Sequence, residues 1–127
     1  MKTVIAEEQA RKEIAEWAEF FEAELSEESI LSLLPSVMRG RVILDEESEQ
    51  FIIELRSPIE LKNGEKVTSV TMREPMAGEL QDAGKFKNDM DMAMNMYSKL
   101  TGHPLGIIQR LKQRDLIAIS GVFDFFG

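Results

Sequence analysis

The stretch FIIELRSPIELKNGEKVTSVTM, residues 51–72, decides the fold of this chain. Apolar segments lie on both sides of Asn63-Gly64, and an Asn-Gly pair in that position is the strongest short-range signature of a β-hairpin. Both residues tolerate the positive φ of a type I′ turn, so we expect positive φ at each. Pro58 interrupts the first segment, which should therefore be an edge strand or a broken one. The stretch predicts a hairpin with strands of residues 51–61 and 65–73.

Helices are predicted after the hairpin, where the sequence period changes back following Glu74-Pro75. Gly102 is a natural residue just past a helix end, and Pro104 suits the first turn of the next helix. Asp115 could cap a last helix, whose apolar residues fall on one face. The predicted helices cover residues 76–85, 86–100, 104–112 and roughly 115–126.

Two amphipathic helices are predicted before the hairpin. Apolar residues recur at spacings of three and four from about Thr3 to Leu25. Ser26 can cap a second helix, which Pro35 should end or kink near Leu34. A short strand at 42–44 and a charged turn at 45–49 would follow. The order is an N-terminal helical arm or hairpin, a central β-hairpin and three to four short helices, which predicts an α+β fold. We expect an acidic helical extension over residues 1–45 and an α+β domain over residues 46–127.

The net charge of −8 is concentrated in the N-terminal third of the 127 residues. Residues 1–49 contain five basic and thirteen acidic residues, whereas residues 50–127 contain ten of each. An acidic surface argues against nucleic-acid binding, because that affinity comes from Lys and Arg. The acidic helices could attract a basic partner surface, keep the protein in solution, or form a solvated helix face.

Little in the sequence suggests catalysis, a cofactor or a metal. The chain has no cysteine, which excludes thiolate chemistry and Cys-based metal sites. Its one histidine, His103, lies between Gly102 and Pro104, where a cap or turn role is favoured over a role as ligand or base. Asp89 and Asp91 begin a pattern like a calcium loop, but later positions hold Ala93, Met94 and Leu100 instead of the required Asn or Asp, Gly and Glu. We therefore expect a protein that is not an enzyme.

No membrane segment is expected either. The apolar run at the N-terminus is too short for a signal peptide, and no window approaches the roughly 18 apolar residues of a membrane span. The expected location is a reducing cytosol.

Four methionines within one predicted helix favour a binding function, because the flexible thioether suits adaptable contacts. Helical geometry places Met90, Met94 and Tyr97 on one face and Met92 and Met96 on another. Packing of one face in the core is the alternative reading. We predict that Met92 and Met96 form the exposed set, because Tyr97 and Met90 give the other side a bulkier face. All five residues are candidate partner-binding residues.

A series of short motifs lies in a fixed order along residues 51–126. They are Ile59–Leu61, Asn63-Gly64, the run Val67–Pro75 leading into Gly78-Glu79-Leu80, Leu100–Pro104, Ile108–Leu111 before Asp115-Leu116, and Phe125-Phe126. Their order and spacing resemble the Mu-like phage tail assembly chaperone family. Met76 departs from the Ser or Thr that usually caps the following helix, and His103 departs from the usual Leu. Residues 1–45 have no counterpart in the family pattern.

This resemblance implies a non-catalytic assembly factor of the bacterial host cytosol. Such a factor binds the tape-measure protein, helps tail-tube subunits assemble around it, and is absent from the mature virion. Self-association stays open. Two alternatives also stay open from the residues alone: an acidic inhibitor or regulatory protein that binds a basic surface, and a minor structural tail or connector protein of the virion.

Overall fold

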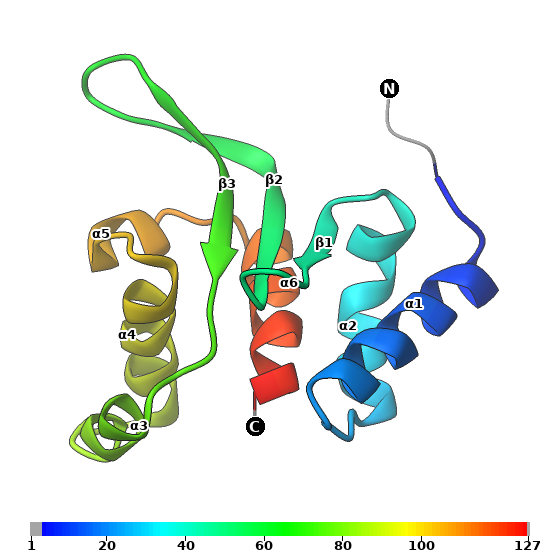
Figure 1. Ribbon diagram of the computed structural model, residues 1–127. Coiled ribbons are helices and arrows are strands. Elements are labelled where there is room, and N and C mark those ends of the chain that lie inside the picture. The colour runs from blue at the N-terminus through cyan, green and yellow to red at the C-terminus, as the bar shows by residue number, and fades with distance from the viewer. Residues whose placement is uncertain (1–3, 127) are drawn as a thin grey trace.

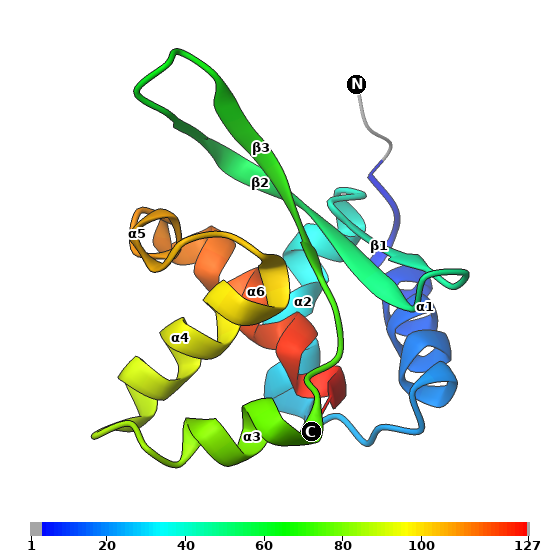
Figure 2. The ribbon, with the colours of Figure 1, turned by 60° about the vertical axis from the view of Figure 1, so that its left-hand side comes forward.

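A three-stranded antiparallel sheet and six α-helices form the fold in the computed structural model, which describes residues 4–126 (Figure 1). The predicted α+β class is confirmed. The strands follow the order β1-β2-β3, with helices gathered on one side of the sheet (Figure 2). Their bounds are β1 Val42–Asp45, β2 Gln50–Glu60 and β3 Lys66–Met72.

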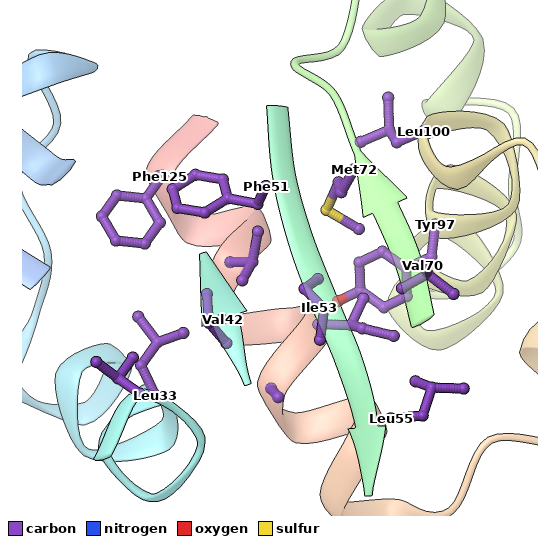
Figure 3. Packing of buried hydrophobic residues seen from close by; sticks show 14 of the residues in the cluster. Leu33, Val42, Phe51, Ile53, Leu55, Val70, Met72, Tyr97, Leu100 and Phe125 are labelled. Carbon is purple, nitrogen blue, oxygen red and sulfur yellow. The ribbon is translucent and has the colours of Figure 1, made fainter. Parts of the chain in front are cut away.

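The predicted hairpin is formed by β2 and β3. Phe51 pairs with Met72 and Ile53 pairs with Val70, and all four side chains are buried on the face that the helices cover (Figure 3). The pairing shifts register between Glu54 and Ile59, in the segment that contains Pro58. This is the interruption that a proline without an N–H predicts.

The turn of the hairpin differs from the predicted type I′ turn. Gly64 has a φ of +87°, but Asn63 does not have positive φ. The Gly64 N–H donates to the carbonyl of Leu61 at 3.0 Å, and the Leu61 N–H donates to the carbonyl of Glu65 at 2.7 Å. The loop therefore has three residues and needs the left-handed conformation only at its last one, which Gly64 supplies. The prediction of positive φ at Asn63 is wrong.

The N-terminal helices are α1 Glu7–Phe20 and α2 Glu27–Met38. Ser26 caps α2 as predicted, since its hydroxyl accepts the Ser29 N–H at 3.1 Å. Pro35, however, lies inside α2, which continues to Met38, so the proline does not end the helix near Leu34. Leu34 and Val37 are buried on either side of the exposed Pro35. Core packing thus carries the helix through the proline, whose missing hydrogen bond lies on the solvent side.

Both N-terminal helices pack into the same hydrophobic core as the sheet. Trp17 of α1 meets the ring of Phe51 edge to face, with centroids 5.6 Å apart, and Phe21 lies 5.4 Å from the same ring. A Cβ at Gly121 would lie 2.8 Å from Leu33 of α2, so this glycine permits the close approach of α2 and the C-terminal helix. The division at residue 45 predicted from the sequence concerns independent folding units, and truncation rather than packing tests it.

Four helices follow the hairpin: α3 Ala77–Ala83, α4 Asp89–Thr101, α5 Leu105–Ile108 and α6 Gln113–Phe123, with a final 3₁₀ turn, η1 Asp124–Phe126. They are shorter than predicted. Asn88 caps α4 by accepting the Asp91 N–H at 2.8 Å, so residues 86–88 lie outside that helix. Gly102 ends α4 with a φ of +74°, as predicted. Pro104 is the residue before α5 rather than a residue of its first turn.

Candidate partner-binding site

The position of α4 is fixed by Arg73, which follows β3. Its guanidinium donates to both oxygens of Glu79 in α3, at 2.8 and 2.7 Å, and also to the carbonyl of Lys99 in α4 at 3.4 Å. Its backbone N–H donates to the carbonyl of Leu100 at 3.3 Å. One arginine therefore joins the end of the sheet to α3 and α4.

Glu79 also stabilises the start of α3, where Met76 cannot act as a cap. Its Oε1 accepts the Met76 N–H at 2.9 Å. The hydrogen bond from Arg73 and then that from Met76 lower the pKa of Glu79 to about 2. The helix start lacks a side-chain acceptor at Met76, and the carboxylate three residues later satisfies a backbone donor of the first turn.

The position of α6 is fixed by Asp115. Its carboxylate is buried and accepts the N–H of Arg56 at 2.7 Å and the N–H of Ser57 at 3.0 Å. Both donors belong to the part of β2 where the pairing with β3 shifts. The prediction that Asp115 caps its own helix is wrong, because α6 begins at Gln113 and Asp115 lies in its first turn. The carboxylate oxygens of Asp115 instead accept hydrogen bonds from the interrupted strand, β2.

A groove of about 330 Å³ lies between α4 and α6. Met90, Met94 and Tyr97 of α4 form one wall, and Leu116 and Ile117 of α6 line the other. Met90 is 63% exposed and Ile117 is 41% exposed, so the rim is apolar and open to solvent. Tyr97 is buried and meets Phe123 of α6 edge to face at 5.6 Å. Burial raises the pKa of Tyr97, and a hydrogen bond with Ser120 acts in the opposite direction.

The predicted exposed set, Met92 and Met96, is wrong. Met96 is only 4% exposed, Met92 is half-buried, and the exposed methionine is Met90. Met96 and Tyr97 are consecutive and thus about 100° apart on the helix, so they belong to neighbouring faces rather than opposite ones. The side of α4 that carries Met96, Tyr97 and Leu100 faces the core. Met90 and Met94 are left on one flank, beside α6.

Sequence reasoning missed the second wall of the groove. Periodicity predicts that the apolar residues of the last helix fall on one face, and it does not single out Leu116 or Ile117 as a wall of a groove. The available signal was that Ile117 is an apolar residue off that face. Periodicity alone does not say which helix packs beside which, so it could not pair Ile117 with Met90.

The described residues contain no group of three or more His, Asp or Glu side chains placed to hold a metal ion. Within residues 4–126, no helix has the length and apolar character required to cross a membrane. The His103 backbone belongs to the turn after α4: its carbonyl accepts the Ser98 hydroxyl at 2.6 Å, and its N–H donates to the Thr101 hydroxyl at 3.4 Å.

Fold and groove together define a small α+β protein with an accessible apolar contact surface between two helices. A family model described as phage tail assembly chaperone proteins, E, or 41 or 14, matches residues 52–127. The chain therefore belongs to the phage tail assembly chaperone family, which confirms the resemblance and supports a non-catalytic role in tail assembly. Comparison with curated proteins and with solved structures gave no significant match.

Proposed function

We propose that this chaperone binds the phage tape-measure protein in the groove between α4 and α6. It does so in the cytosol of the bacterial host, while tail-tube subunits assemble around the tape-measure protein, and it is absent from the mature virion. The observation that carries the proposal is the open apolar rim formed by Met90 and Ile117.

The groove suits a helical segment. Two packed helices offer a third helix a row of side chains on each, at the interaxial distances of about 8–10 Å usual for helix packing. A tape-measure protein is long, helical and apolar before the tube encloses it, and a chaperone must meet many segments of such a protein. Met90 and Met94 supply flexible side chains that adjust to different apolar partners.

The acidic surface suits the same function. An apolar partner lowers the solubility of any complex that it forms, and net charge far from zero opposes aggregation. The chain has a net charge of −8. We therefore assign binding to the groove and solubility to the acidic helices.

Capture of co-expressed fragments of the tape-measure protein tests this proposal. The double variant Met90→Gln/Ile117→Gln should bind at least about tenfold more weakly, equivalent to about 1.4 kcal/mol. The control is Met76→Gln/Leu80→Gln on α3, where the side chains are 67% and 52% exposed but do not line the groove. Equal capture by the two double variants and the parent protein would place the contact elsewhere.

A further inference from the structure

A second cavity, of about 470 Å³, lies on the other side of α6 and is lined by four arginines. Arg39 follows α2, Arg41 precedes β1, Arg56 belongs to β2, and Arg114 lies in the first turn of α6. Segments far apart in the sequence thus bring four arginine residues to the lining of one hollow. We call it the arginine pocket.

The arginine pocket is cationic in a protein whose net charge is −8. Its one acidic lining residue, Asp115, has both oxygens engaged by the N–H groups of Arg56 and Ser57. Among residues 4–126, none of the ion pairs in the structure involves the four arginine side chains. The cationic charge of the pocket is therefore available to an external anion.

The arginine pocket and the α4–α6 groove share one residue. Ile117 lines both, so the two hollows are neighbours across the exposed edge of α6. Leu31 and Pro35 of α2 add apolar surface to the pocket beside its arginines. A segment seated in the groove and extending past Ile117 would meet the guanidinium groups next.

We propose that the arginine pocket binds the carboxylates of an acidic flank on the same helical segment that the groove holds. This inference rests on the proposed function and specifies the partner: an apolar helix with Asp or Glu beside its apolar face. Guanidinium groups pair with carboxylates through two parallel hydrogen bonds, which gives both strength and orientation. Nucleic acid is the weaker choice, because Leu31, Pro35 and Ile117 give the pocket an apolar lining that suits a protein helix better than a phosphate backbone.

Two synthetic amphipathic peptides of about 20 residues, a length that can form a helix, test the inference. They share one Leu-rich face and differ in one flank, which carries Glu in the first peptide and Lys in the second. The net charge of the chain favours the Lys peptide, whereas the arginine pocket favours the Glu peptide. At low ionic strength we expect the Glu peptide to bind at least about tenfold more tightly, with a preference that falls as salt is added.

The variant Arg56→Gln/Arg114→Gln should abolish this preference, and Lys12→Gln/Lys62→Gln should keep it with the same change in net charge. Met90→Gln should weaken both peptides alike. Thermal unfolding checks that each variant is folded. If the double arginine variant is not, the single variant Arg39→Gln takes its place, and it should reduce the affinity ratio of the Glu peptide to the Lys peptide by at least half. Equal binding of the two peptides, tighter binding of the Lys peptide, or a Glu preference that survives the arginine substitutions overturns the inference.

Other occupants are distinguished in the same set of measurements. If the arginine substitutions change the oligomeric state and leave the peptide preference intact, the pocket binds a second copy of the chain. If they instead change the binding of a single-stranded oligonucleotide and leave that preference intact, the pocket binds nucleic acid. Either result would also overturn the inference. Failure to capture tape-measure fragments alongside a normal Glu preference would overturn the proposed function alone.

Discussion

Arg73 and Glu79 form a two-pronged ion pair, with Nη1–Oε1 at 2.8 Å and Nη2–Oε2 at 2.7 Å. The pair joins the residue after β3 to the first turn of α3, and Arg73 also holds the end of α4. These residues belong to one of the motifs whose order and spacing resemble the family pattern, the run Val67–Pro75 leading into Gly78-Glu79-Leu80. The motif therefore has a structural role: it holds α4, which forms one wall of the groove, against the sheet.

The ion pair predicts how stability depends on pH. The pKa of Glu79 is lowered from 4.5 to about 2 in the folded protein, so its stabilising contribution is complete above pH 4.5 and is lost as the pH falls toward 2. Glu79→Gln should remove that part of the acid dependence. Because Arg73 is about one-third exposed, we expect a cost of only about 1 kcal/mol at pH 7. Urea unfolding at several pH values measures both the stability cost at pH 7 and its acid dependence, with Glu74→Gln as the control. If the free energy of unfolding of Glu79→Gln and that of the parent protein change in parallel with pH, this account is contradicted.

Substitution of Asp115 should lower the free energy of unfolding more than substitution of any other carboxylate in the chain. Asp115→Ala leaves two backbone N–H groups of β2 without their acceptor, at roughly 1–3 kcal/mol each. We expect a loss of about 3 kcal/mol in the free energy of unfolding, and a smaller loss for Asp115→Asn, which keeps one acceptor oxygen. Asp82→Ala on the exposed side of α3 is the control. A stability loss no larger than that of Asp82→Ala would mean that water replaces the carboxylate without cost.

Of the two signature residues of the hairpin turn, only Gly64 should cause a large loss of stability when it is substituted. Gly64→Val forces a β-branched residue into the left-handed region and should cost roughly 1 kcal/mol or more. Asn63→Ala should cost less, since it removes only the hydrogen bond from the Glu65 N–H. Thermal unfolding compares the two. A larger loss at Asn63 than at Gly64 would contradict the three-residue loop.

Removal of the N-terminal third should unfold the rest of the chain. A protein of residues 46–127 lacks Trp17 and Phe21, which cover Phe51, and it also lacks β1, which pairs with β2. We expect no cooperative thermal transition and no dispersed amide spectrum by NMR. A folded fragment of residues 46–127 would instead support the division at residue 45 that the order of predicted elements suggests.

The hairpin was predictable because its signals are local: Asn63-Gly64, Pro58 and the flanking apolar segments lie within 22 residues. The groove was predictable only in part. Helical spacing grouped Met90, Met94 and Tyr97 correctly, but the side that faces the core depends on how α4 packs on β3, which spacing does not contain. Asp115 was misread for the same reason, since its partners at Arg56 and Ser57 are more than fifty residues away.

Site-specific photo-crosslinking tests the central claim most directly. A photoreactive residue at position 90, on the rim of the α4–α6 groove, should crosslink to the co-expressed tape-measure protein, and the same residue at position 76 on α3 should not. The two positions carry methionines of similar exposure, 63% and 67%, so accessibility alone cannot separate them. Crosslinks from position 90 with none from position 76 are the predicted result. Crosslinks from position 76 alone, or equally from both, would contradict the assignment of the groove as the binding site.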